Sequence, residues 1–179
     1  LSTGTSAELW DVAWKPDGSY ALICGSSGTV LKYDGSSVTS LSSGVSDRLR
    51  GTAWKPDGSY ALLVGDGERM LRFDGSTFTS LRSGQGSRFN DVAWKPDGTY
   101  AIAASTSNSL RLYDGSGLYG RQSFSSGGLY TVAWKPDGSY ALIGGDWGLL
   151  LRYSENPAHL YGAQYTVRNA DDNNLYYIL

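Results

Sequence analysis

The sequence has almost none of the side chains that carry most metal and nucleophilic chemistry. Its 179 residues include one cysteine, Cys24, and one histidine, His159. A lone cysteine excludes an intrachain disulfide and a cysteine zinc site. A lone histidine, which we interpret as an exposed bystander, leaves neither a His-dependent catalytic triad nor a His-rich metal site. We therefore expect no enzymatic activity, no metal and no cofactor.

The chain also lacks an excess of basic charge and long apolar runs. Fifteen Lys and Arg residues stand against 17 Asp and Glu residues, so no basic surplus is present to neutralise a phosphate backbone. Apolar runs are only a few residues long, whereas a membrane-spanning helix needs about 20. We expect neither nucleic acid as a partner nor a membrane span.

The start of the chain and its composition bear on where the protein works. The sequence begins with Leu rather than Met, which indicates a processed product or a fragment. Its 24 glycines and 13 tyrosines, with abundant serine and little lysine, favour a secreted or cell-surface location.

One decapeptide occurs four times. AWKPDGSYAL stands at 13–22 and 53–62, returns as AWKPDGTYAI at 93–102, and recurs unchanged at 133–142. A period near forty residues is typical of solenoids and propellers. Because the period is unbroken, we expect a single domain, 1–179. It contains four repeats and a remnant that matches the start of a fifth: 1–40, 41–80, 81–120, 121–160 and 161–179.

The repeated decapeptide predicts a β-hairpin. Pro16 and Asp17 suit the corners of a type I turn, and Gly18 can take a positive φ. We expect Lys15 to oppose Ser19 and Trp14 to face Tyr20, which would fix the register. Alternation then places Trp10, Val12, Trp14, Tyr20, Leu22 and Cys24 on one face. The expected structural pairs are Trp14 with Tyr20, Trp54 with Tyr60, Trp94 with Tyr100, and Trp134 with Tyr140.

Two further strands follow each hairpin. A polar turn leads to a third strand such as VLKYD or MLRFD, and a DGS turn leads to a fourth such as SVTSLSS. No segment has the three-four apolar spacing of a helix. The fold class is therefore all-β, and four-stranded antiparallel units of about 40 residues are typical of propeller blades. The bulky aromatic face of each unit would cover a smaller face of its neighbour.

These motifs resemble those of the WD-repeat family. VAWKPDG is similar to the family's first strand and turn, and TVLKYD is similar to its third strand, which ends in Trp-Asp. Tyr33-Asp34, Phe73-Asp74 and Tyr113-Asp114 carry another aromatic in that dipeptide, whereas Tyr153-Ser154 lacks the Asp. The family's opening Gly-His pair is absent. The chain therefore resembles a divergent WD-repeat-like β-propeller, a likeness that bears on fold more than on function.

Closure of the ring has three alternatives. A five-bladed ring with an abbreviated last blade, completed by the N-terminal segment, is slightly favoured. Two or more chains could instead complete a larger ring as a homo-oligomer, or the chain could be part of a longer protein. Unpaired blade edges invite pairing in each case.

The loops that vary between repeats are the candidate binding surface. The hairpin turns are nearly constant, whereas the loops at the other end of each unit differ, and aromatic and Arg residues gather there. We predict a noncatalytic scaffold that recognises a macromolecular partner, a protein or a glycan, through these loops. The alternatives are a carbohydrate-binding propeller and a structural protein that assembles into rings or fibres. The candidate residues are Trp10, Arg48, Arg50, Asp66, Glu68, Arg88, Asn90, Tyr130, Asp146 and Trp147.

Overall fold

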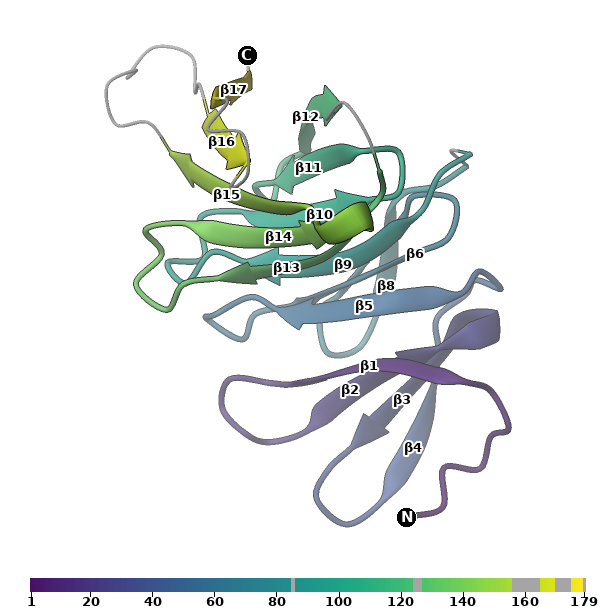
Figure 1. Ribbon diagram of the computed structural model, residues 1–179. Coiled ribbons are helices and arrows are strands. Elements are labelled where there is room, and N and C mark those ends of the chain that lie inside the picture. Colours follow the sequence, from purple (N-terminus) through teal and green to yellow (C-terminus); the bar gives the residue numbers. More distant parts are fainter. Residues whose placement is uncertain (85, 124–126, 156–164, 170–174, 179) are drawn as a thin grey trace. The chain divides into compact units, whose positions relative to one another are not determined.

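The regular structure of the chain consists mainly of short antiparallel strands (Figure 1). The computed structural model describes residues 1–84, 86–123, 127–155, 165–169 and 175–178. Helical structure in these residues is limited to the single turns η1 (Ser26–Gly28) and η2 (Asp146–Gly148). The prediction of an all-β fold is therefore confirmed.

The strands form four antiparallel sheets. Three sheets have four strands each, in the orders β1-β2-β3-β4, β5-β6-β7-β8 and β9-β10-β11-β12, and the last has the order β13-β14-β15-β16-β17. Each of the first three sheets is thus a meander of consecutive strands, as the repeat predicts. The bounds are β1 (Leu9–Trp14), β2 (Ala21–Gly25), β3 (Thr29–Tyr33), β4 (Val38–Ser42), β5 (Leu49–Trp54), β6 (Ala61–Gly65), β7 (Arg69–Phe73), β8 (Phe78–Arg82), β9 (Phe89–Trp94), β10 (Ala101–Ser105), β11 (Ser109–Tyr113), β12 (Leu118–Ser123), β13 (Leu129–Trp134), β14 (Ala141–Gly145), β15 (Leu150–Glu155), β16 (Tyr165–Asn169) and β17 (Leu175–Ile178).

The last sheet extends into the remnant of the repeat. Strand β16 pairs with β15, with Tyr153 opposite Val167, and β17 pairs with β16. These two strands therefore continue the fourth sheet, whereas the repeat alignment assigned 161–179 to a partial fifth blade. The number of blades and the single domain 1–179 remain predictions.

The hairpin turn differs by one residue from the predicted one. The Lys15 amide donates to the Tyr20 carbonyl over 2.9 Å, and Trp14 lies opposite Ala21 rather than Tyr20. The turn therefore holds four residues, 16–19, instead of three. The Asp17 carboxylate closes it by accepting hydrogen bonds from the amide and hydroxyl of Ser19 at 2.9 and 2.6 Å.

This extra residue reverses the faces of the second strand, because side chains alternate along a strand. Trp14 and Val12 share a face with Ala21 and Ile23, whereas Leu22 and Cys24 lie on the opposite face with Ala13. The predicted single face of Trp10, Val12, Trp14, Tyr20, Leu22 and Cys24 is wrong for the last three. The register is the same in the second and fourth hairpins, where Trp54 opposes Ala61 and Trp134 opposes Ala141.

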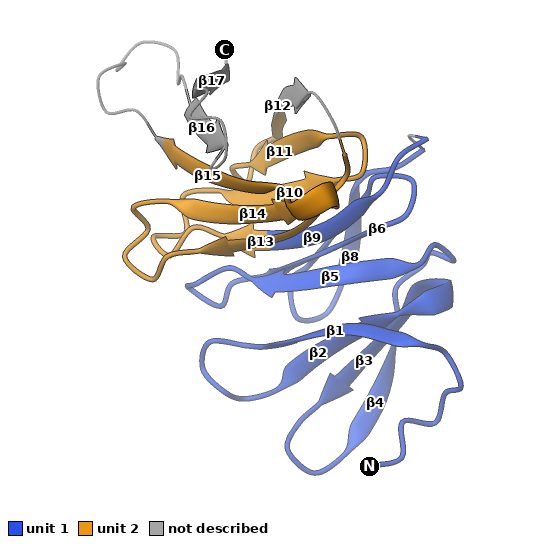
Figure 2. Cartoon of the chain, in the orientation of Figure 1, with its two compact units in different colours: residues 1–92 blue, residues 93–179 orange. Residues whose placement is uncertain are grey.

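The chain divides into two compact units, 1–92 and 93–179 (Figure 2). In the first unit, the core lies between the first two sheets, where Leu22, Cys24 and Val30 pack against Leu63 and Phe73. In the second unit, Ile102, Ala104 and Leu110 form a core with residues of the fourth sheet: Leu129, Ala141, Ile143, Leu151 and Tyr153. Each core thus joins one sheet to the next through apolar faces, as expected for a repeat protein.

Candidate functional site

The first unit brings four of the predicted loop residues into one cluster, which we call the Trp10 cluster: Trp10, Arg48, Arg50 and Asp66. The guanidinium carbons of Arg48 and Arg50 lie 5.0 and 5.3 Å from the centroid of the Trp10 ring. Arg50 Nε donates to the Asp66 carboxylate over 2.6 Å, and the Asp66 amide donates to the Arg48 carbonyl over 2.9 Å. The indole Nε1 of Trp10 donates to Ser26 Oγ over 3.1 Å.

This cluster has the chemistry of a protein interface. Trp10 is 45% exposed, and its ring is held on one edge by the hydrogen bond to Ser26. Cation–π contacts of this kind contribute about 0.5–1 kcal/mol at exposed sites. Tryptophan and arginine dominate the binding energy of protein interfaces, and side chains already held in place lose less entropy on binding.

Two further predicted residues adjoin the Trp10 cluster. Arg88 forms an isolated β-bridge with Asp66, and its Nε donates to Asn90 Oδ1 over 3.1 Å. The cluster therefore extends from the start of the first sheet to the start of the third within the first unit. Six of the ten candidates are brought together in this way.

A half-buried carboxylate, that of Asp11, ties the first two sheets together. Asp11 accepts hydrogen bonds from the Val12 amide and from the Thr52 amide of the next sheet, both at 2.8 Å. Burial raises the pKa of the Asp11 carboxyl, and the two amide bonds oppose that rise. Because its oxygens are occupied by backbone amides, Asp11 holds the sheets in place.

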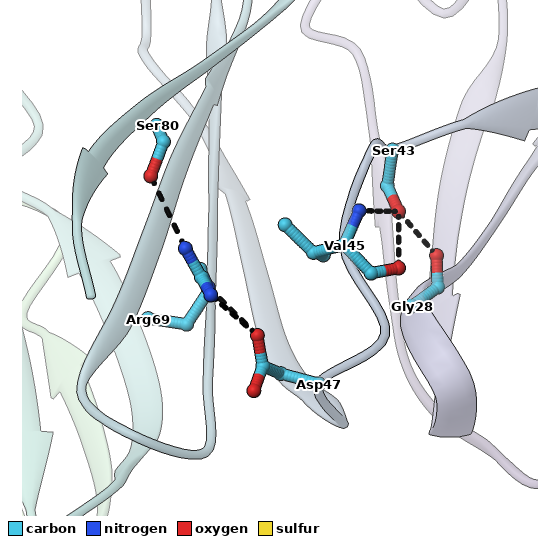
Figure 3. Close-up of polar contacts among 6 residues, drawn as sticks. All are labelled: Gly28, Ser43, Val45, Asp47, Arg69 and Ser80. Atoms are coloured by element: carbon cyan, nitrogen blue, oxygen red, sulfur yellow. Dashed lines mark hydrogen bonds and ion pairs between the residues drawn. The ribbon is translucent and has the colours of Figure 1, made fainter. Parts of the chain in front are cut away.

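The connection between the first two sheets is fastened at both ends (Figure 3). Ser43 Oγ donates to the Gly28 carbonyl over 2.6 Å, and the Gly28 amide donates to the Asp47 carbonyl over 2.8 Å. The Asp47 carboxylate accepts from Nε and Nη2 of Arg69 at 2.9 and 2.6 Å, while Arg69 Nη1 reaches Ser80 at 3.3 Å. This fastening fixes the loop that carries Arg48.

Glu68 does not belong to an exposed binding surface, contrary to its choice as a candidate. It is 3% exposed, and its carboxylate accepts from Nε and Nη2 of Arg82 at 2.9 and 2.6 Å. Its backbone has a φ of +50°, and its amide donates to the Ser87 carbonyl over 2.9 Å. We conclude that Glu68 is a structural residue that holds the loop between β6 and β7 through its bonds to Arg82 and Ser87.

The ion pairs of Asp47 with Arg69 and of Glu68 with Arg82 escaped sequence reasoning. A signal was present, because both partners of each pair are charged in the second repeat only. Forty residues earlier, Ala7, Thr29, Gly28 and Ser42 occupy the corresponding positions. Charges of opposite sign confined to one copy of a repeat indicate a contact special to that copy.

The second unit presents the remaining three candidates: Tyr130, Asp146 and Trp147. Asp146 Oδ2 accepts from the Gly128 amide over 2.6 Å, and the Asp146 amide donates to the Gly128 carbonyl over 3.0 Å. These bonds hold the η2 turn against the start of β13. Tyr130 is 44% exposed.

Trp147 is the most exposed of the candidates, at 84%. It follows Asp146 in the η2 turn with a φ of +54°, in the left-handed region that disfavours bulky side chains. Ser27 holds the corresponding position in the η1 turn with a φ of +57°. The turn therefore accepts a small polar residue, Ser27, in the first repeat and exposes a large apolar one, Trp147, in the fourth.

The repeated aromatic residues pack between sheets instead of across each hairpin. Tyr20 contacts Trp54 of the next sheet edge-to-face with 5.4 Å between ring centroids, and Tyr100 contacts Trp134 at 5.5 Å. Trp14 contacts Tyr33 within the first sheet at 6.1 Å. The expected pairing of Trp14 with Tyr20 is therefore wrong, because the four-residue turn offsets the two side chains.

Reactive side chains are few in the described part of the chain. No group of three or more His, Cys, Asp or Glu side chains suited to a metal ion occurs among them, and His159 lies outside them. Burial raises the pKa of the Cys24 thiol, which keeps it in the unreactive protonated form. Within the same residues, no helix has the length and apolarity needed to cross a membrane.

Comparison with known proteins identifies the repeat. The family model for the WD domain, G-beta repeat, matches residues 1–34 and 75–114. Both matches end at a tyrosine–aspartate pair, Tyr33-Asp34 and Tyr113-Asp114. No curated protein matches the chain. Together with the four-stranded antiparallel sheets, these matches are consistent with a WD-repeat-like β-propeller. Repeats of this kind indicate, in general, noncatalytic scaffolds for protein interaction.

Proposed function

We propose that the chain is a noncatalytic scaffold that binds a protein partner through its variable loops. The observation that carries this proposal is the exposure of Trp147, 84%, on a left-handed backbone with a φ of +54°. A non-glycine residue in this conformation costs about 1–3 kcal/mol and persists only where the surrounding structure imposes it. Strain of this kind concentrates at ligand-binding sites, and an exposed tryptophan is a typical hot-spot residue.

The Trp10 cluster supports a protein partner over a carbohydrate. Arg48 and Arg50 lie over the Trp10 ring and leave less of its surface for stacking on a sugar. An aromatic ring flanked by two guanidinium groups, of which that of Arg50 is held by the Asp66 carboxylate, suits a peptide surface with carboxylate and apolar groups. Trp147 and the Trp10 cluster are proposed as anchors on their respective units.

Panning a peptide display library against the full chain tests this function. We expect bound peptides whose Kd is weakened at least about tenfold by Trp147→Ser or by Arg50→Met, since hot-spot residues contribute about 2 kcal/mol or more. Trp147→Ser introduces the residue that the same turn carries at Ser27, so folding should persist. Lys135→Gln, in the hairpin turn at the other end of the fourth sheet, is the matched control and should leave the Kd unchanged.

Two outcomes would contradict the proposal. Peptides that bind equally well to the chain and to both loop variants would place recognition elsewhere. A glycan array that yields ligands sensitive to Trp147→Ser, with no peptide selected, would favour the carbohydrate-binding alternative.

A further inference from the structure

The first sheet has an apolar face that stays open in the described part of the chain. Val12 and Trp14 on this face are 59% and 53% exposed. Together with Ile23, Leu31 and Tyr33 they line a hollow of about 430 Å³. We call this surface the Trp14 face. A contiguous apolar surface on an uncovered sheet face is the type of surface that forms interfaces.

The second sheet shows what covers the same face elsewhere in the chain. Trp54, at the position of Trp14, is only 7% exposed, and Leu63, at the position of Ile23, is fully buried. Within the first unit they pack against the opposite side of the first sheet, which presents Leu22, Cys24 and Val30. A sheet face that carries the residue equivalent to Trp14 is therefore covered by the face of another repeat that carries the residue equivalent to Leu22.

The fourth sheet carries such a complement, also open in the described part of the chain. Leu142 and Leu150 occupy the positions of Leu22 and Val30 in the repeat. Leu22 and Val30 are fully buried, whereas Leu142 and Leu150 are 41% and 43% exposed. The equivalent residues of the second and third repeats, Leu62, Met70, Ile102 and Leu110, are all buried. We call the exposed surface the Leu142 face.

We propose that the Trp14 face of one copy of the chain binds the Leu142 face of a second copy. The repeat supports a second copy of the chain as the partner. Within the first unit, the Leu22 side of the first sheet packs against the Trp54 side of the second sheet. Position 142 is leucine like position 22, and position 14 is tryptophan like position 54, so the two open faces match these two packed ones. The two faces differ from one another, so the contact is heterologous, and each copy retains one further face for another copy. The proposed contact joins two sheet faces, and Trp10 of the loop surface lines the same hollow as Trp14.

Measurement of the mass in solution tests the proposal on the full chain. We expect sedimentation equilibrium to give a mass that rises with concentration above the 19.2 kDa of one chain. Val12→Glu and Leu142→Glu each place a charge on an exposed position of one face, so each should abolish self-association while leaving the circular dichroism spectrum unchanged. Thr39→Glu, on an exposed position of β4, is the matched control and should assemble as the unaltered chain does.

Mixing the two variants separates this proposal from other modes of assembly. The Val12→Glu chain keeps an intact Leu142 face, and the Leu142→Glu chain keeps an intact Trp14 face. An equimolar mixture should therefore form a dimer with twice the mass of one chain and nothing larger.

Three results would overturn the inference. A chain that stays monomeric at all concentrations would mean that each face is covered within the chain or bears another ligand. Single variants that still associate would place the contact elsewhere. A mixture that stays monomeric would exclude the pairing of the two faces.

Discussion

Replacement of Gly28 by alanine tests whether the close contact between the η1 turn and the connection behind it stabilises the first unit. Gly28 has a φ of +67°, and a Cβ there would lie 1.9 Å from the carbonyl oxygen of Val45. Because that oxygen belongs to the backbone, the whole connection must shift. The shift would break the 2.6 Å bond from Ser43 (Figure 3) and the 2.8 Å bond from the Gly28 amide to the Asp47 carbonyl.

Gly148 provides a matched control, because it holds the same turn position in the fourth repeat. Its φ is +77°, but a Cβ there would meet nothing within 4 Å. Alanine in a left-handed backbone costs about 1 kcal/mol relative to glycine at both sites. The two lost hydrogen bonds add about 1 kcal/mol each at Gly28 alone. We therefore expect the free energy of unfolding to fall by about 3 kcal/mol for Gly28→Ala and about 1 kcal/mol for Gly148→Ala.

Urea unfolding followed by circular dichroism measures both losses, and amide hydrogen exchange assigns each loss to a unit. The protection of amides in β1 to β8 should fall for Gly28→Ala and be unchanged for Gly148→Ala. Equal losses for the two variants would refute the reasoning, since they would show that the carbonyl of Val45 imposes no constraint.

Three further predictions concern charged groups of the first unit. Asp11→Ala should lower the free energy of unfolding by about 1–3 kcal/mol, because the Thr52 amide would lose its partner; unchanged urea midpoints would contradict this. The hydrogen bond from Lys55, aided by Ser59, lowers the pKa of Asp57 to about 2, so its stabilisation is complete above pH 4 and should be lost as the pH falls toward 2. Asp57→Asn should reduce this loss of the urea midpoint at low pH, to which the equivalent turns at Asp17, Asp97 and Asp137 also contribute, and an unaltered profile would exclude a role for the Asp57 turn. Arg82→Met should destabilise by about 3–5 kcal/mol because it leaves the buried Glu68 carboxylate without its cation, and Glu68→Gln in the same chain should recover part of the loss.

The sequence predicted which loops gather charged and aromatic residues, but it did not predict correctly every residue that is exposed there. The contrast between constant turns and varied loops pointed to Trp10, Arg48, Arg50 and Asp66, which do gather in the first unit. Glu68 has the same charged character in the sequence, yet it is buried beside Arg82. Residue type and spacing do not reveal the direction of a loop side chain, because that direction depends on what the next strand places beside it.

The sequence by itself determined the repeat, the strands and the type of turn. The forty-residue period, the Pro-Asp-Gly corner and the alternating apolar residues are local properties, and each strand follows from them. Tertiary structure decided the register and the burial. A turn of four residues in place of three moved Leu22 to the side opposite Trp14, and only the hydrogen bond from Lys15 to Tyr20 settles that choice. Leu22 and Leu142 end identical decapeptides, yet one is buried and the other exposed, because burial depends on the neighbouring sheet and no decapeptide encodes its neighbour.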